Sequence, residues 1–239
     1  MRASVVIATR NRLPQLQNAL PTVIASVDVR HPGIEIIVVD DGSTDGTIEY
    51  LRKLSEIARF KIVRLERSGG YRGNPSAVLN RGHLEARGDV IIEQGGEVAH
   101  LGRTCIGPLL DHCRPGTVAL ARVHNGTTEE MNQVNDAIRN GSYPYPRIVT
   151  VSNPQTNGDK WRVPRVDPGG VELYCGAERP APFLFCGAIH RKDFERVGGY
   201  DERLPRRNDQ DLAERLVASG VRFTFVGDAV AFHLRHGKS

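Results

Sequence analysis

The first hundred residues alternate between short apolar runs and longer amphipathic segments. Residues 5–7 form a continuous apolar run, as is typical of a strand that is buried on both faces. Over residues 13–27 the apolar positions recur at steps of three and four, which predicts an amphipathic helix. Pro14 suits the first turn of this helix, whereas we expect Pro21 to kink it.

The alternation continues to about residue 92. Residues 34–39, 60–65 and 90–92 predict three further strands, and apolar stripes at residues 48–58 and 75–87 predict helices between them. Strands that alternate with helices in this way favour an α/β fold with an open, mostly parallel sheet covered by helices.

The second half of the chain is less regular. An irregular stretch near residues 141–182 is rich in Pro, Gly and Asn, and we interpret it as a functional loop or flap. The segments around it predict strands at 118–123 and 221–226, helices at 129–139 and 211–219, and an apolar segment at 183–189.

Composition narrows the class of protein. The chain has 239 residues, of which 39% are hydrophobic and 25% charged, so it can bury a core, and we expect a single domain over residues 1–239. Its 32 basic and 28 acidic residues leave a net charge of +4, which is too small to predict a nucleic-acid partner.

Cysteine spacing and hydropathy bear on location. The four cysteines form no C-x-x-C pair and have no histidine at a spacing that predicts a zinc site, so we expect reduced thiols in a cytoplasmic protein. They are Cys105, Cys113, Cys175 and Cys186. No apolar window is long enough to span a membrane, although peripheral membrane contact remains possible. The sequence does not indicate the oligomeric state.

Polar residues follow the first two predicted strands, at the edge where open α/β sheets bind ligands. Thr9, Arg10 and Asn11 follow the first strand, and Asp40 and Asp41 end the second. A carboxylate there can accept a hydrogen bond from a nucleotide base or a ribose hydroxyl. No G-x-G-x-x-G follows the first strand, which counts against a dinucleotide cofactor.

The second loop also has a structural interpretation. Asp-Gly-Ser-Thr-Asp is good turn and helix-capping chemistry, with Ser43 or Thr44 as the expected cap of the next helix. Capping accounts for Ser43, Thr44 and Asp45, but not for two adjacent carboxylates at the end of a strand.

Four blocks together resemble family 2 glycosyltransferases of the GT-A fold. They are V-V-I-A-T-R-N-R with I-I-V-V-D-D-G-S-T-D-G-T, N-R-G with A-R-G-D, a block from Gly187 to Leu212 that includes G-G-Y-D-E and N-D-Q-D-L, and V-A-F-H near the end. The resemblance implies a Rossmann-like twisted sheet with helices on both faces. It also implies a nucleotide-sugar-binding half at 1–100 and an acceptor-binding half at 101–239.

The resemblance further implies roles for individual residues. Asp209 occupies the position of the catalytic base, and Asn208, where the family usually has an acid, and Asp211 would support the acceptor or its loop. The residues that would bind the nucleotide are Thr9, Arg10, Asn11, Asp40, Asp41 and Asn80. From the sequence alone, Asp209 and Asp211 could also be first-turn acids that complement the helix dipole.

The metal motif departs from the family pattern. Where the family has Asp-x-Asp, this chain has Gly95, Gly96 and Glu97, and Glu93 lies two residues too early to replace the missing acid. The resemblance implies a divalent cation, Mn²⁺ or Mg²⁺, at Glu97 with His233 as a partner. Substrate phosphates would have to complete the coordination.

We therefore expect an inverting glycosyltransferase that moves a sugar from a nucleotide-diphosphate donor to a saccharide or other hydroxyl acceptor, in polysaccharide or glycoconjugate synthesis. A sugar-nucleotide pyrophosphorylase is disfavoured, because the first strand is followed by neither a glycine-rich loop nor a lysine. A non-catalytic nucleotide-sugar-binding protein and a retaining transferase remain as alternatives.

Overall fold

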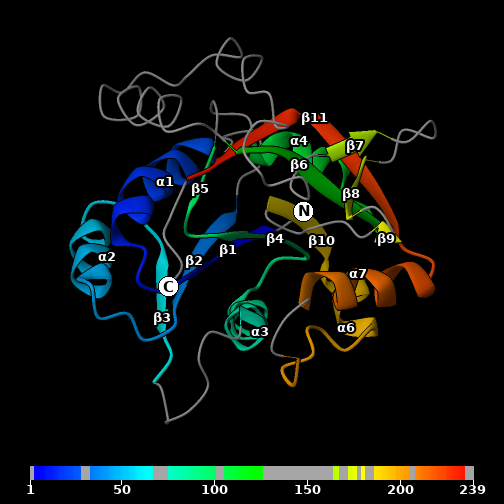
Figure 1. Cartoon of the computed structure of the whole chain (residues 1–239). Coiled ribbons are helices and arrows are strands. Elements are labelled where there is room, and N and C mark those ends of the chain that lie inside the picture. Colours follow the sequence, from blue (N-terminus) through cyan, green and yellow to red (C-terminus); the bar gives the residue numbers. More distant parts are fainter. Residues whose placement is uncertain are drawn as a thin grey trace.

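The structure, a computed structural model, describes most of the chain (Figure 1). The described residues are 3–27, 33–66, 75–100, 105–125, 164–166, 172–176, 179–180, 186–204 and 208–234.

Strands and helices alternate through the first half, as the sequence predicts. They are β1 (Ala3–Thr9), α1 (Leu13–Ser26), β2 (Ile34–Asp40), α2 (Thr47–Ser55), β3 (Lys61–Arg64), α3 (Pro75–Glu85), β4 (Val90–Gly95), β5 (Val98–His100) and α4 (Ile106–His112). The second half adds β6 (Thr117–Asn125), β7 (Pro164–Val166), β8 (Glu172–Gly176), β9 (Arg179–Pro180), β10 (Cys186–His190), α6 (Arg191–Arg196), α7 (Asn208–Ala218) and β11 (Arg222–His233).

Eight strands form one sheet in the order β3-β2-β1-β4-β10-β6-β11-β5. The pairs β3–β2, β2–β1, β1–β4 and β6–β11 are parallel, whereas β10 and β5 run antiparallel to their neighbours. The predicted open, mostly parallel sheet is confirmed. The antiparallel β10 joins the strands of the first half to β6 and β11.

The sheet carries a hydrophobic core on each face. Apolar residues of α1, α2 and α4 pack on one face, and those of α3, α6 and α7 pack on the other (Figure 1). The side chains of β4 alternate between the two cores, with Ile92 on the first face and Ile91 on the second. Consecutive side chains of this strand therefore lie on opposite faces of the sheet.

Several elements differ from the sequence prediction. Helix α1 continues through Pro21 to Ser26, and the short elements β5, α4 and α6 were not predicted, because so few residues show no clear periodicity. Within the stretch expected to be irregular, β7, β8 and β9 form a small antiparallel sheet. The helix predicted at 129–139 lies outside the described residues. In the described part of the chain, no helix has the length and apolar character that a membrane crossing requires.

Candidate active site

The parallel strands β1, β2 and β4 end at one edge of the sheet. Thr9 pairs with Asp40 across β1 and β2, and Ala8 pairs with Gly95 across β1 and β4. The backbone N–H of Gly96 then donates to the carbonyl of Ala8 at 2.8 Å. Residues that the sequence analysis assigned to nucleotide and metal binding are thus brought together from three separate segments.

The two adjacent carboxylates at this edge have different partners. Asp40 is fully buried, and its oxygens accept hydrogen bonds from the backbone N–H of Ser43 at 3.1 and 3.3 Å. Asp41 lies 3.8 Å from the guanidinium of Arg10. Burial raises the pKa of Asp41, the charge of Arg10 opposes this, and the neighbouring Asp40 adds to it.

Asn11 joins the loops that follow β1 and β2. Its backbone N–H donates to Oγ of Ser43 at 2.9 Å, and its side-chain Oδ1 accepts from the backbone N–H of Thr44 at 2.8 Å. The residue has a φ of 46°, a left-handed conformation that Asn tolerates better than most residues. Through these two hydrogen bonds Asn11 holds the loop after β1 against the loop after β2.

The expected helix cap is wrong. Neither Ser43 nor Thr44 caps α2, because the helix begins only at Thr47, after Gly46 with a φ of 90°. Asp45 instead accepts hydrogen bonds from the backbone and hydroxyl of Thr47, at 3.1 and 2.6 Å.

The hydroxyl of Thr9, at the strand edge, is buried. Oγ1 of Thr9 is buried and makes no hydrogen bond within the described part of the chain. A Cβ built on Gly96 would lie 2.8 Å from this hydroxyl oxygen, so only glycine fits there while Thr9 keeps its position. Because buried polar groups are nearly always hydrogen-bonded, this hydroxyl is a candidate contact for a ligand.

Glu97 and His233 form a pair beside the same edge. Their Oε1 and Nε2 atoms are 3.7 Å apart, and their side chains are 19% and 6% exposed. β11 carries His233 to this position by pairing it with Val98 of β5. A Cβ built on Gly95 would lie 2.7 Å from Oε1 of Glu97, so the Glu97 carboxylate fills the space that a side chain at position 95 would need.

This pair fits a divalent cation in its donor chemistry. It offers a carboxylate oxygen and an imidazole nitrogen, both of which Mn²⁺ accepts, while two protein groups are too few to complete an octahedron. The missing first acid of the motif is thus partly explained, because the longer Glu97 side chain needs the space that an aspartate at position 95 would occupy.

Asp209 lies partly buried in the first turn of α7. Burial, together with the smaller effect of the negative charge of Glu93, raises its pKa to about 6. Glu93 is itself 1% exposed on β4, where its two oxygens contact Nε2 of His83 at 2.8 Å and the hydroxyl of Tyr200 at 2.7 Å. A carboxyl group with a pKa near neutrality can take up a proton at physiological pH.

The remaining predicted residues have structural partners. Asn208 donates to the hydroxyl of Ser76 and so ties the start of α7 to α3. Asp211 accepts from Nε of Arg215 at 2.9 Å within its own helix. Asn80 holds the backbone of Tyr200 through two hydrogen bonds, at 2.9 and 3.0 Å.

Sequence reasoning missed most of the network around Glu93. His83 lies in α3 and stacks on Phe194 with ring centroids 3.6 Å apart, and Tyr200 lies in the loop after α6. The available signal was Glu93 itself, a charged residue inside an otherwise apolar strand, which needs buried partners.

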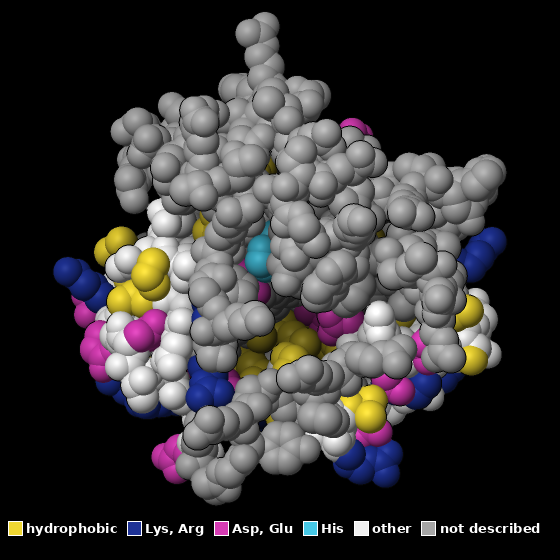
Figure 2. Space-filling view, in the orientation of Figure 1, with side chains coloured by type: hydrophobic (Ala, Val, Ile, Leu, Met, Phe, Trp, Pro, Cys, Tyr) yellow, Lys and Arg dark blue, Asp and Glu magenta, His cyan; other side chains and the backbone are white. Residues whose placement is uncertain are grey.

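Described side chains of several kinds are visible near the centre of Figure 2. Acidic side chains gather there, with hydrophobic side chains below them and a histidine beside them (Figure 2). This concentration of acidic groups contrasts with the positive net charge of the whole chain, +4.

The family model for glycosyl transferase family 2 matches residues 4–158. This range includes Thr9, Asp40 and Asp41 at the strand ends and Glu97. The chain belongs to glycosyl transferase family 2. Among curated proteins, an N-acetylglucosaminyl-diphospho-decaprenol L-rhamnosyltransferase of Mycobacterium tuberculosis is 29% identical over 96% of this chain and 75% of its own length. A dolichol-phosphate mannosyltransferase of Pyrococcus furiosus is 34% identical over 42% of this chain.

Solved structures confirm the GT-A fold of this family 2 glycosyltransferase. A mannosyltransferase of Pyrobaculum calidifontis, solved with GDP-Man and Mn²⁺, has a TM-score of 0.67 and 18% identity over 100% of this chain and 58% of its own. GalNAc-T7, solved with UDP, GalNAc and Mn²⁺, has a TM-score of 0.68 and 19% identity over 99% of this chain and 44% of its own.

The glycosyltransferase spans only part of several relatives. It covers 27% of the Pyrococcus protein and 26% of an uncharacterized glycosyltransferase of Nostoc that is 34% identical over 91 residues. Family membership shows that the chain is a glycosyltransferase enzyme, while its donor, acceptor and stereochemistry are a separate question.

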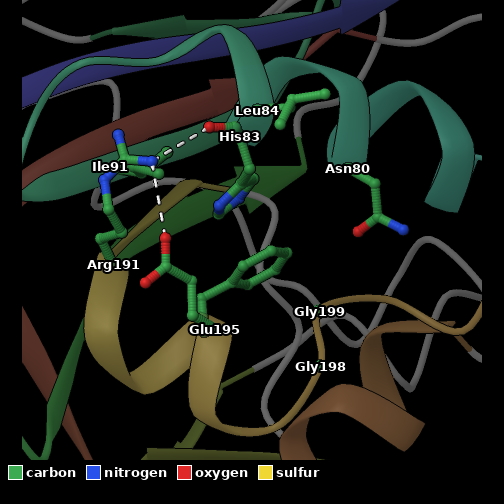
Figure 3. A pocket seen from close by; sticks show the side chains of 9 residues that line it. Asn80, His83, Leu84, Ile91, Arg191, Glu195, Gly198 and Gly199 are labelled. Carbon is green, nitrogen blue, oxygen red and sulfur yellow. Dashed lines mark hydrogen bonds and ion pairs between the residues drawn. The ribbon is translucent and has the colours of Figure 1, made fainter.

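The transferase also has a pocket of about 400 Å³ between α3 and α6 (Figure 3). Ile91, near the beginning of β4, lines this pocket, whereas Glu97 lies after Gly95, the last residue of β4. Arg191 at its wall donates to the carbonyls of Gly88 and Ala86, at 2.9 and 2.7 Å, and so caps the end of α3. Asn80 and His83 also line this pocket, and His83 contacts Glu93, so the pocket adjoins the buried network around Glu93.

Proposed function

We propose that this glycosyltransferase moves a sugar from a nucleotide-diphosphate donor to an acceptor hydroxyl with inversion, and that Asp209 is the general base. The observation that carries the proposal is the environment of Asp209. Its carboxyl is partly buried beside the buried Glu93, and its pKa is raised to about 6. A base of that pKa is ionised at neutral pH and accepts a proton as the acceptor oxygen attacks.

The chemistry needs one proton acceptor and one leaving group. The acceptor oxygen forms a bond to the anomeric carbon, the bond from that carbon to the nucleoside diphosphate breaks, and the hydroxyl proton passes to Asp209. The sugar is oxocarbenium-like as the bonds exchange, as in glycoside hydrolysis. Negative charge develops on the diphosphate and has to be stabilised.

The nucleotide would bind at the edge formed by β1 and β2. The unpaired hydroxyl of Thr9 and the carboxylates of Asp40 and Asp41 are suited to a base or ribose, while Arg10 is suited to phosphate. The neighbours solved with GDP-Man and with UDP support a nucleotide-sugar donor.

Glu97 and His233 would hold a divalent cation, Mn²⁺ or Mg²⁺. When bound there, the cation would supply positive charge for the diphosphate that leaves. The two neighbours solved with Mn²⁺ support this part of the proposal.

The acceptor to test first is a lipid-linked saccharide. The relative that matches 96% of this chain is named for L-rhamnosyl transfer with N-acetylglucosaminyl-diphospho-decaprenol. We include a cytoplasmic location in the proposal, because Cys105, Cys113 and Cys186 are not paired in disulfides, as is typical of a reducing compartment.

Two variants test the proposed roles of Asp209 and Asp40 separately. Asp209→Asn should lower kcat by about 10²- to 10⁴-fold while leaving nucleotide affinity nearly unchanged, because the base acts on the acceptor. Asp40→Ala should weaken binding of the nucleoside diphosphate by about tenfold or more, because a hydrogen bond to a charged group is lost.

The measurements are calorimetric titration of the nucleotide and transfer assays on a panel of nucleotide sugars with lipid-linked acceptors. Near wild-type turnover of Asp209→Asn would remove this residue from the mechanism. Unchanged nucleotide affinity in Asp40→Ala would make its loop a purely structural turn. A wild-type protein that binds nucleotide sugars but transfers none would favour the non-catalytic alternative.

A further inference from the structure

Three soft metal-ligating side chains meet on the opposite face of the sheet from Glu93. His100 ends β5, Cys105 directly precedes α4, and Cys186 begins β10. One ligand atom from each lies within 4.8 Å of the others. The three residues are at most 1% exposed, and both cysteines belong to the core that α1 and α4 cover.

The spacing of these atoms is close to that of a zinc site. Sγ of Cys186 is 3.8 Å from Nε2 of His100. Tetrahedral zinc, with Zn–S of about 2.3 Å and Zn–N of about 2.0 Å, holds sulfur and nitrogen ligands about 3.5 Å apart. A zinc ion can therefore be accommodated by small side-chain movements.

Gln94 supplies a fourth donor. Its Nε2 donates to the carbonyl of Val98 at 2.9 Å, which directs its Oε1 toward the cluster. That oxygen is hydrogen-bonded to Nε2 of His100 at 2.6 Å and lies 4.0 Å from Sγ of Cys186. Nitrogen and oxygen ligands of a tetrahedral zinc are about 3.3 Å apart, so metal binding replaces this hydrogen bond and moves the two atoms apart. Gln94 and Cys186 are also register partners across β4 and β10, so the backbone holds both donors on one face.

The two ring nitrogens of His100 have different surroundings, since Nε2 faces Gln94 and Cys186. Nδ1 of His100 is buried and makes no hydrogen bond in the described part of the chain. Cys113 shows the ordinary environment of a core cysteine for comparison. It is equally buried, and its thiol faces the backbone carbonyl of Thr117 at 3.6 Å.

We propose that His100, Cys105 and Cys186 bind a structural zinc ion, with Oε1 of Gln94 as the fourth ligand. Both cysteines coordinate as thiolates, so their two protons are released to solvent as the metal binds, and His100 coordinates through Nε2 as neutral imidazole. The ion joins β4, β5, β10 and the start of α4, which come from distant parts of the sequence.

This site is distinct from the Glu97–His233 pair. Thiolates and imidazole select zinc, whereas carboxylate with substrate phosphates suits Mn²⁺ or Mg²⁺. The ligands are fully buried, so the ion enters during folding and stabilises the folded chain rather than taking part in transfer. The proposal does not depend on the proposed function.

The test is the metal content of the purified full chain, expressed with zinc in the medium and separated from free metal by gel filtration. We expect about one zinc per chain by elemental analysis, as for other structural zinc sites. Refolding in Co²⁺ should give thiolate-to-cobalt charge-transfer absorption and the intense visible bands of tetrahedral cobalt.

Variants separate the site from the other thiol. Cys186→Ser and Cys105→Ser should lose the zinc and the cobalt bands, whereas the matched control Cys113→Ser should keep both. If the site variants fail to fold, the wild-type protein still decides the question. Substoichiometric zinc together with no thiolate–cobalt band in wild type would overturn the proposal and leave a hydrogen-bonded thiol–imidazole cluster.

Discussion

Asp209 and Asp211 share the first turn of α7 but have different surroundings. Asp211 forms an ion pair with Arg215 of the same helix, with Oδ2 2.5 Å from a guanidinium nitrogen. Asp209 lies beside the buried Glu93 instead, and its pKa is raised to about 6, first by burial and then by that charge. Two acids in the same helical turn thus have different partners because of what the rest of the fold brings to them.

The pH dependence of transfer follows from this environment. Because Asp209 must be ionised to act as a base, kcat/KM should rise with pH through about 6. Glu93→Gln removes a negative neighbour, so the midpoint should move to lower pH by up to about one unit, while burial maintains the rest of the shift. The measurement is a pH–rate profile of both proteins.

Glu195→Gln is the control for that experiment, because the Glu195 side chain is 62% exposed on α6. Its midpoint should match that of wild type. An unchanged midpoint in a folded Glu93→Gln protein would show that Glu93 does not act on the catalytic proton.

At the scale of elements, one carboxylate serves the beginnings of two helices. Oδ2 of Asp45 accepts from the backbone N–H of Leu13, the first residue of α1, at 2.9 Å, and Oδ1 accepts from Thr47, the first residue of α2. The N-cap residues of these helices, Arg12 and Gly46, make no side-chain cap bond of their own. The position of both helices relative to the strand edge therefore depends on Asp45.

Asp45→Ala should lower the free energy of unfolding by about 1–2 kcal/mol, the usual range for a lost cap. Burial opposes ionisation of Asp45, but the hydrogen bonds from Thr47 and Leu13 outweigh it, and its pKa is lowered. The stabilisation should thus be present at neutral pH and disappear as pH falls through that pKa.

Denaturant unfolding at pH 7 and at acidic pH measures both effects. Thr44→Ala, at an exposed position expected from the sequence to be a cap, should change stability by no more than about 0.5 kcal/mol. If Thr44→Ala costs as much as Asp45→Ala, the hydrogen bonds of Asp45 are not what stabilises these helix ends.

At the scale of the whole molecule, Glu97 and His233 meet because the last strand, β11, lies between β6 and β5 in the sheet. β11 pairs in parallel with β6 and antiparallel with β5, and the backbone N–H of Leu234 donates to the carbonyl of Glu97 at 2.8 Å. The cation site proposed at this pair therefore depends on both halves of the chain.

Metal and nucleotide should bind cooperatively at this site, each raising the affinity of the other by the same factor. Two protein ligands bind a cation weakly, and the diphosphate supplies further oxygens. Mn²⁺ should serve better than Ca²⁺, because imidazole suits it better than it suits the larger, harder ion.

Titration of the nucleoside diphosphate with and without Mn²⁺, on wild type and on Glu97→Gln, measures this coupling. Glu97→Gln should lose most of it and still bind nucleotide alone. Equal affinity under all conditions, with activity that persists in chelator, would mean that arginines stabilise the leaving group.

The sequence by itself determined the strand–helix order of the first half and the chemistry of the strand ends. Continuous apolar runs and steps of three and four are local properties, so β1, α1, β2, α2 and α3 could be predicted from neighbouring residues. Thr9, Asp40 and Asp41 could be proposed as ligand-binding residues from the sequence, because they lie where two parallel strands end and such sheets bind ligands at that edge.

Only the tertiary structure decided which distant side chains meet. The contacts of Glu93 with His83 and Tyr200 and the His100–Cys105–Cys186 cluster each join residues from separate elements. The Glu97–His233 pair was expected from the family resemblance, but not from the spacing of the two residues. Sequence spacing does not report such contacts, because they depend on strand order and register. The strand order depends on the antiparallel β10, which lies between β4 and β6, and on β11, which lies between β6 and β5. Neither strand has a local sequence pattern that reveals its partners.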